Sequence, residues 1–104
     1  MAKKSPTQLC LAKARDEGYT AQVTERWNPF ARVRQDLFGF IDVLVLAGDE
    51  VWGIQCTTKN NMAARKRKIL EHENYAVVKK ATIRIFVEGW EKVKNKWVCK
   101  TIEL

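Results

Sequence analysis

A single acidic residue, Asp42, stands inside an apolar run that extends from Phe38 to Leu46. The run is rich in Phe, Ile, Val and Leu, as in a strand that is covered on both faces. A carboxylate in such a strand needs a partner, because an unpaired charge is costly to bury. The sequence therefore predicts a buried strand that carries one polar function.

A second predicted strand, residues 51–57, returns beside the first after the turn residues 47–50. Two such runs joined by a short turn indicate an antiparallel hairpin. Side chains alternate along a strand, so one of its faces is polar and the other is a packing face. The polar face is expected to hold Gln55, Thr57 and Lys59, and the packing face Trp52, Ile54 and Cys56.

An acid on one strand, followed by a polar-x-polar triplet at the end of the next, resembles the motif of the PD-(D/E)XK nucleases. The segments that carry the resemblance are Gly39-Phe40-Ile41-Asp42 and Gln55-Cys56-Thr57. This superfamily includes restriction endonucleases and archaeal-type Holliday-junction resolvases. Its Asp and second acid hold a divalent metal, and its Lys assists the attacking water. Asp42 matches the family Asp, whereas Gln55 stands in place of the second acid and Thr57 in place of the Lys.

The resemblance implies a metal-dependent DNA endonuclease whose substrates include branched DNA, and it is compatible with a homodimer. It implies Mg²⁺ or Mn²⁺ held by Asp42, Gln55 and the carbonyl of Cys56, with Thr57 at the position of the catalytic Lys. Lys59 or Arg65 could restore the missing cation from nearby. The alternative is a catalytically inactive nuclease-fold module for DNA binding or assembly, because an amide brings Mg²⁺ no negative charge.

A second candidate acid, Glu25, lies in a predicted strand from Tyr19 to Trp27, on the face that also carries Ala21 and Val23. A carboxylate among apolar neighbours is usually a metal ligand or a salt-bridge partner. Two interpretations are open: Glu25 contributes charge to the catalytic site, or it sits half-exposed at the strand end and pairs with an arginine.

The sequence contains 19 Lys and Arg residues and 12 Asp and Glu residues, which gives a formal net charge of +7. This balance favours an anionic partner, and nucleic acid before a membrane surface. The predicted loop at residues 28–36 and the predicted helix that follows Thr57 carry most of the candidate contacts. The candidate DNA-binding residues are Arg32, Arg34, Arg65, Lys66 and Lys68. A solvated basic surface is the alternative interpretation for the same residues.

The remaining elements complete an α/β (α+β by strict usage) restriction-endonuclease-like core: a mixed central sheet flanked by two helices, with a C-terminal β-hairpin, in one domain over residues 1–104. The first helix begins at Ser5 and Pro6, and Gln8 either completes its cap or turns inward.

The second helix is expected from Asn60 or Asn61 to about Asn74. Its inner stripe is predicted to be Met62, Ile69 and Leu70, and in the tail Gly89 is expected to end a strand and Trp90 to meet Trp97.

The cellular location is expected to be the cytoplasm, because no apolar run approaches the roughly 20 residues of a membrane helix and no secretory signal is visible. The three cysteines, Cys10, Cys56 and Cys99, lack metal-binding spacing and are predicted to be free thiols. His72 is the only histidine and is predicted to be a surface residue, which argues against zinc.

Overall fold

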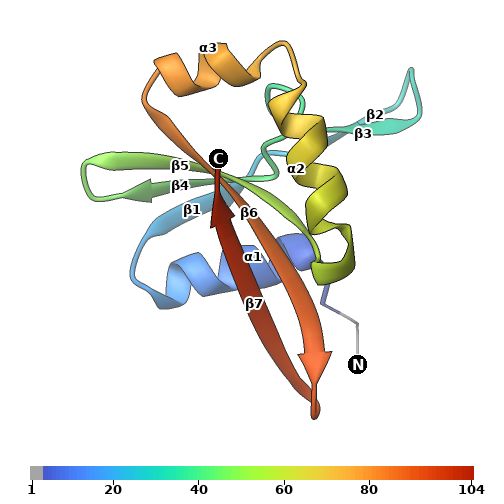
Figure 1. Cartoon of the computed structure of the whole chain (residues 1–104), viewed down its shortest axis with the longest axis vertical. Coiled ribbons are helices and arrows are strands. Elements are labelled where there is room, and N and C mark those ends of the chain that lie inside the picture. The colour runs from blue at the N-terminus through green and yellow to red at the C-terminus, as the bar shows by residue number, and fades with distance from the viewer. Residues whose placement is uncertain (1–3) are drawn as a thin grey trace.

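The computed structural model describes residues 4–104 and shows an α+β fold in which one mixed five-stranded sheet lies between helices (Figure 1). The sheet has the order β1-β4-β5-β6-β7, and β2 and β3 form a separate two-stranded hairpin. In chain order the elements are α1 Pro6–Asp16, β1 Thr20–Val23, β2 Arg26–Asn28, β3 Val33–Gln35, β4 Val43–Ala47, β5 Glu50–Thr58, the 3₁₀ turn η1 Lys59–Asn61, α2 Met62–Leu70, α3 Tyr75–Lys80, β6 Ile83–Val93 and β7 Lys96–Glu103.

The pairing of the strands confirms the mixed sheet and both predicted hairpins. Strands β4 and β5 pair antiparallel, with Val43 opposite Ile54, and β6 and β7 close the C-terminal hairpin. Strand β6 runs parallel to β5, because η1, α2 and α3 carry the chain back across the sheet. The strand predicted from Phe38 is shorter in the structure, since the sheet pairing begins only at Val43.

Each face of the sheet has its own hydrophobic core. Helix α1 covers one face through Leu9, Cys10 and Ala14, which pack on Ile54 and other strand residues. Helices α2 and α3 cover the opposite face through Met62, Ile69 and Val78, which pack with Phe40, Ile41, Ile85 and Val87. The alternation predicted for β5 therefore separates its side chains between two differently built layers.

Helix α1 begins as the sequence predicts. The backbone N–H of Gln8 donates to Ser5 Oγ over 3.2 Å, and Pro6 occupies the first helical turn. The chain leaves the helix through Gly18, whose φ of 90° is accessible to glycine at little cost. The Gln8 side chain is exposed, so the interpretation in which it turns inward is wrong.

The region between Tyr19 and Asp36 differs from the prediction. The expected strand to Trp27 divides into β1, which joins the main sheet, and β2, which pairs with β3. The expected loop at 28–36 is the tip and second strand of this hairpin. Asn28 explains the turn, because its Oδ1 accepts the backbone N–H groups of Phe30 and Ala31 at 3.0 and 3.2 Å, and its carbonyl accepts that of Arg32 at 2.8 Å.

The predicted second helix is shorter than expected, because α2 ends at Leu70 instead of about Asn74. Helix α3 lies beyond its expected end and was not predicted, so the described residues form three α-helices instead of two. Met62 and Ile69 are buried as predicted, whereas Leu70 is 43% exposed and does not belong to the inner stripe. His72 lies between α2 and α3, where its Nδ1 accepts the backbone N–H of Asn74 at 3.0 Å and its ring meets Phe40 edge-on. The prediction of a surface histidine is therefore wrong.

Two expectations for the C-terminal strands are corrected. Gly89 does not end a strand, because β6 continues through it, and a β-carbon at this position would overlap the Met62 side chain. Trp90 does not meet Trp97: Trp90 is buried and its Nε1 donates to Cys10 Sγ over 3.2 Å. Trp97 is exposed beside Lys92, whose Nζ lies 5.5 Å from the ring centre.

Within residues 4–104, every helix is too short or too polar to cross a membrane.

Candidate metal and nucleic-acid site

Asp42 lies just before β4, where the backbone of β5 and of the residue that follows β1 holds it in place. Its N–H donates to the carbonyl of Ile54 at 2.9 Å, and its own carbonyl accepts the N–H of Thr24 at 2.8 Å. The residue is 3% exposed. By alternation from Val43, its side chain lies on the face of the sheet that α2 and α3 cover, together with that of Gln55.

The Asp42 carboxyl receives two hydrogen bonds from β5. Gln55 Nε2 lies 2.6 Å from Asp42 Oδ2, and the backbone N–H of Cys56 donates to the same oxygen over 2.9 Å. Cys56 thus contacts Asp42 through a donor, whereas the expectation gave its carbonyl the role of a metal ligand. Gln55 Oε1 is buried and has no hydrogen-bond partner among the described residues.

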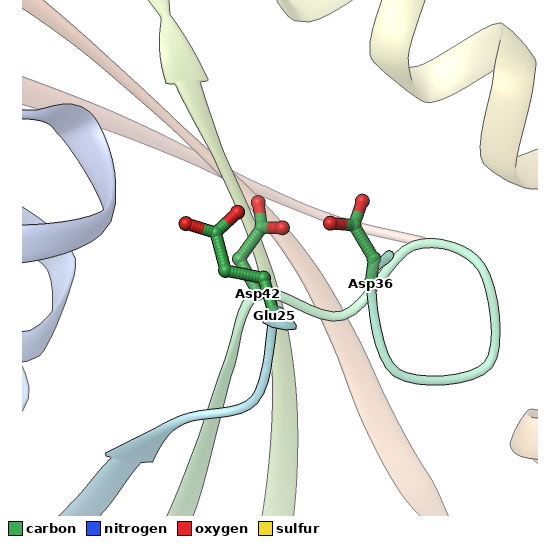
Figure 2. A group of neighbouring side chains, drawn as sticks. All are labelled: Glu25, Asp36 and Asp42. Atoms are coloured by element: carbon green, nitrogen blue, oxygen red, sulfur yellow. The ribbon is translucent and has the colours of Figure 1, made fainter. Parts of the chain in front are cut away.

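Three carboxylates meet at this point. One oxygen each from Glu25, Asp36 and Asp42 lies within 4.8 Å of the others, and Figure 2 shows that they come from three separate segments of the chain. Glu25 is in the link between β1 and β2, and Asp36 directly follows β3. We call these three residues the acidic group.

The loop from Thr24 to Asp42 gathers the acidic group because its two ends are joined. Besides the backbone bond between these residues, Thr24 Oγ1 donates to the carbonyl of Ile41 over 2.9 Å. A tight turn from Leu37 to Ile41, with two backbone hydrogen bonds between these residues, returns the chain to β4. Gly39 has a φ of 92°, and a β-carbon there would overlap the ring of His72.

The pKa of Asp42 is raised to about 8 in the folded protein. Burial is the main cause, followed by a hydrogen bond with the Asp36 carboxyl; the N–H of Cys56 opposes the shift, and the charges of Asp36 and Glu25 add to it. Closely spaced carboxylates cannot all ionise without a compensating cation. The site therefore needs either a shared proton or a bound cation at neutral pH.

Both interpretations of Glu25 describe part of its environment. Its Oε1 accepts a hydrogen bond from Arg34 NH1 at 3.3 Å, and its side chain is 19% exposed. The same carboxylate also belongs to the acidic group. Arg34 therefore connects the β2–β3 hairpin to the three carboxylates.

The donor set fits a hard divalent cation such as Mg²⁺ or Mn²⁺. These ions prefer carboxylate and carbonyl oxygens, and the acidic group supplies three carboxylates beside the unpartnered carbonyl oxygen of Gln55. The Cys56 thiol is not part of this set: it packs on the α1 face near Cys10, and burial raises its pKa.

The two residues predicted beyond Gln55 on the polar face behave differently. Thr57 is buried on the expected face, next to Gly89 of β6. Lys59 lies in η1, where its Nζ pairs with Glu91 at 3.2 Å, and both side chains are partly exposed. The structure therefore brings Gln55 to Asp42 and engages Lys59 elsewhere.

The predicted basic residues lie on two elements, the β2–β3 hairpin and α2. Arg32 is exposed at the tip of the β2–β3 hairpin, with a φ of 54°. On α2, Arg65 is half-buried, whereas Lys66 and Lys68 are exposed. Lys68 and Arg34 both line an open cavity of about 430 Å³, and the cavity also touches Asp36 of the acidic group.

Two residues of this region were missed by the sequence prediction. Asp36 has no periodic apolar context that would mark it as buried, and only the folded loop places it beside Asp42. His72 lines the same cavity as Asp36, and the only signal was its being the single histidine. A further missed carboxylate, Glu88, is buried on the α1 face, where Lys13 pairs with it at 3.1 Å.

Comparison of the chain with protein-family models, with curated proteins and with solved structures finds no match. The mixed α+β sheet and the acidic group are what the structure itself provides.

Proposed function

We propose that this protein is a metal-dependent endonuclease of the PD-(D/E)XK type that hydrolyses phosphodiester bonds in DNA, including branched DNA. One observation carries the proposal: three carboxylates converge on the face of the sheet that also presents Gln55, beside a basic hairpin. Asp42 takes the place of the Asp in the PD-(D/E)XK motif. Asp36 and Glu25 supply the negative charge that is missing at Gln55, which stands in place of the second acid of the motif.

In this proposal the acidic group holds Mg²⁺ or Mn²⁺ through its carboxylate oxygens, and Gln55 adds its buried carbonyl oxygen. When bound, the cation lowers the pKa of a water molecule and neutralises charge on the scissile phosphate. The amide of Gln55 and the N–H of Cys56 fix the orientation of the Asp42 carboxylate. Hydrolysis adds one water across one P–O bond and leaves a phosphate end and a hydroxyl end.

The basic residues position the DNA backbone. A guanidinium can grip phosphate oxygens with two parallel hydrogen bonds, and Arg34 keeps most of its donors free, since its side chain is 69% exposed and only NH1 contacts Glu25. Lys68 lies across the same cavity from the hairpin. Arg32 on the hairpin and Arg65 and Lys66 on α2 add positive charge to the same two elements.

A second function, a nuclease-fold module that binds DNA without cutting it, is favoured by a different observation. Gln55 and Thr57 replace the second acid and the lysine, and Lys59, which could have supplied a cation, is paired with Glu91. In this alternative the acidic group holds shared protons at neutral pH, and the basic surface alone is used.

Incubation of the protein with linear duplex, single-stranded and four-way DNA in Mg²⁺ or Mn²⁺ separates the two functions. The nuclease predicts cleavage by the wild type that Asp42→Asn abolishes. Asp49→Asn, in the exposed β4–β5 turn, is the matched control and should cut normally. DNA binding without cleavage under all conditions would leave the inactive module as the function.

Binding itself is expected to be electrostatic and tolerant of sequence. The logarithm of the affinity should fall steeply with the logarithm of the salt concentration, by about 0.9 per phosphate contact on duplex DNA. A flat salt dependence, or no binding at low salt, would remove DNA as the partner in both functions.

A further inference from the structure

The β2–β3 hairpin exposes aromatic side chains that the fold does not need. It projects from the end of the sheet (Figure 1), and the side chains of Trp27 and Phe30 are 56% and 98% exposed. Neither residue belongs to the two hydrophobic cores formed by the described residues. Large aromatics left in water on a projecting element are typical of a contact surface.

The charge of the hairpin indicates what it contacts. Residues 26–35 contain the three arginines Arg26, Arg32 and Arg34 and no acidic residue. Arginine and aromatic side chains in alternation are typical of surfaces that bind single-stranded nucleic acid, where the cations follow the backbone and the rings stack on bases.

One face of the hairpin leads from an aromatic ring to the acidic group. Trp27 pairs directly with Arg34 across the two strands, so their side chains lie on the same face. Arg34 in turn donates to Glu25, two residues before Trp27, which is about 7 Å along an extended strand. A ring, a guanidinium and the carboxylates therefore follow one another along this face.

We propose that Trp27 stacks on an unpaired base of the DNA while Arg34 holds the adjacent phosphate at the entrance to the acidic group. The proposal rests on the DNA binding of the proposed function, which does not depend on cleavage, and it narrows the DNA to forms that have unpaired nucleotides. A base within a duplex already has both of its faces covered by its neighbours, so the Trp27 ring can stack only on a base that is unstacked.

A second copy of this chain is the competing occupant of the same surface, because a two-fold dimer would also cover Trp27 and Phe30. A symmetric contact brings the same patch of both copies together. It would place three arginines against three arginines with no acid between them in residues 26–35. Phosphate complements this charge, whereas a second hairpin repels it.

The test measures binding in EDTA, so that no cleavage occurs, with a fluorescent oligothymidylate and a blunt duplex of equal length as probes. Trp27→Ala should weaken binding of the oligothymidylate at least about fivefold, which is the lower limit for loss of one base–aromatic stack. Trp27→Phe should retain most of the affinity, and duplex binding should change little in both variants.

Trp97→Ala is the matched control, since Trp97 is also an exposed tryptophan on a basic hairpin and lies beside Lys92. Unchanged binding by Trp27→Ala, or an equal loss on the duplex, would overturn the proposal. So would a loss confined to Trp97→Ala, or a wild-type dimer in sedimentation that Trp27→Ala converts to a monomer.

The outcome is independent of cleavage. Base stacking by Trp27 with no cleavage in Mg²⁺ or Mn²⁺ would leave this inference standing and remove the nuclease. If the wild type cleaves DNA but Trp27→Ala binds the oligothymidylate as tightly as the wild type does, the nuclease stands and this inference is removed.

Discussion

Gln55 Nε2 donates a hydrogen bond of 2.6 Å to Asp42 Oδ2, and the other end of the same amide, Oε1, is buried without a partner in the described part of the chain. Burial and the neighbouring Asp36 favour the neutral form of Asp42, whereas the backbone N–H of Cys56, which donates to the same oxygen, favours the charged form. Asp42 is thus an acid whose negative charge is supported from one side only, and a cation on the other side would complete its environment.

Asp42→Asn should remove a pH-dependent cost to stability. The unfolded carboxyl titrates near 3.8, and the folded one has a pKa raised to about 8, so between these values the folded state binds a proton that the unfolded state has lost. The contribution of Asp42 to stability is therefore fully present below about pH 4, falls as the pH rises and is lost above about pH 8.

Urea denaturation in EDTA across this pH range measures the effect as the difference between wild type and Asp42→Asn. The asparagine can accept both hydrogen bonds from β5 at Oδ1 and donate to Asp36, as the protonated acid does. We expect the variant to be the more stable protein at pH 8. A loss of about 3–5 kcal/mol, typical of a broken buried ion pair, would instead identify Asp42 as a structural acid.

Divalent metal should stabilise the wild type, and increasingly so towards pH 8, because protons and metal compete for the acidic group. At a concentration one hundred times the dissociation constant, the gain is about 2.7 kcal/mol. Thermal denaturation with and without Mn²⁺ measures it. The stabilisation should disappear in Asp36→Asn and Asp42→Asn and persist in Asp49→Asn; an equal shift in all of these proteins would indicate nonspecific binding.

The elements that the sequence predicted correctly are those with strong local signals. The cap at Ser5 and Pro6, the turn at residues 47–50 and the period of two in β5 each depend on neighbours in the chain. The hairpin of β6 and β7 follows from the same kind of signal, although the passage of β6 through Gly89 does not, because that glycine is required by contact with Met62.

The parts that were missed depend on long-range contacts. Strands β2 and β3 have three residues each, too few for a periodic pattern, and α3 is a single short helix. Asp36 reaches Asp42 only because Thr24 is bonded to the backbone at 41–42 and closes the loop between them. The apolar run around Asp42 thus marked this acid in the sequence, whereas Asp36 comes from a loop that no local pattern marks.

Lys13→Met should destabilise the fold through Glu88. The Glu88 carboxylate is 3% exposed, its Oε1 has no partner among the described residues, and its Oε2 accepts from Lys13. Burial lowers the pKa of Lys13, but the carboxylates of Glu88 and Glu17 raise it by more. Removing the ammonium leaves the buried Glu88 carboxylate without a charged partner. We expect a loss of about 3 kcal/mol, the lower end of the range for broken buried ion pairs, because the Lys13 side chain is a third exposed and water screens the pair.

Urea denaturation of Lys13→Met at neutral pH measures this cost. Adding Glu88→Gln should recover much of it, since the remaining amide is neutral. Lys100→Met, at an exposed position in β7, should change stability little. If Lys13→Met and Lys100→Met were equally stable, the ion pair would be a surface contact without energetic weight.

Gln55→Glu tests whether the acidic group is a cation site that lacks one ligand. Without metal the variant should be less stable at neutral pH, by about 3 kcal/mol, because it loses the amide donor to Asp42 and places a fourth carboxylate, itself buried, beside the acidic group. With Mn²⁺ it should be stabilised more than the wild type, because a carboxylate brings the charge that the amide lacks.

Gln55→Met is the control, because it also loses the donor to Asp42 but adds no charge. Mn²⁺ should stabilise this variant no more than it stabilises the wild type. If Gln55→Glu were destabilised in EDTA and Mn²⁺ restored no more stability than in Gln55→Met, the carboxylates would be sharing protons and the DNA-binding module without catalysis would be the better account of this fold.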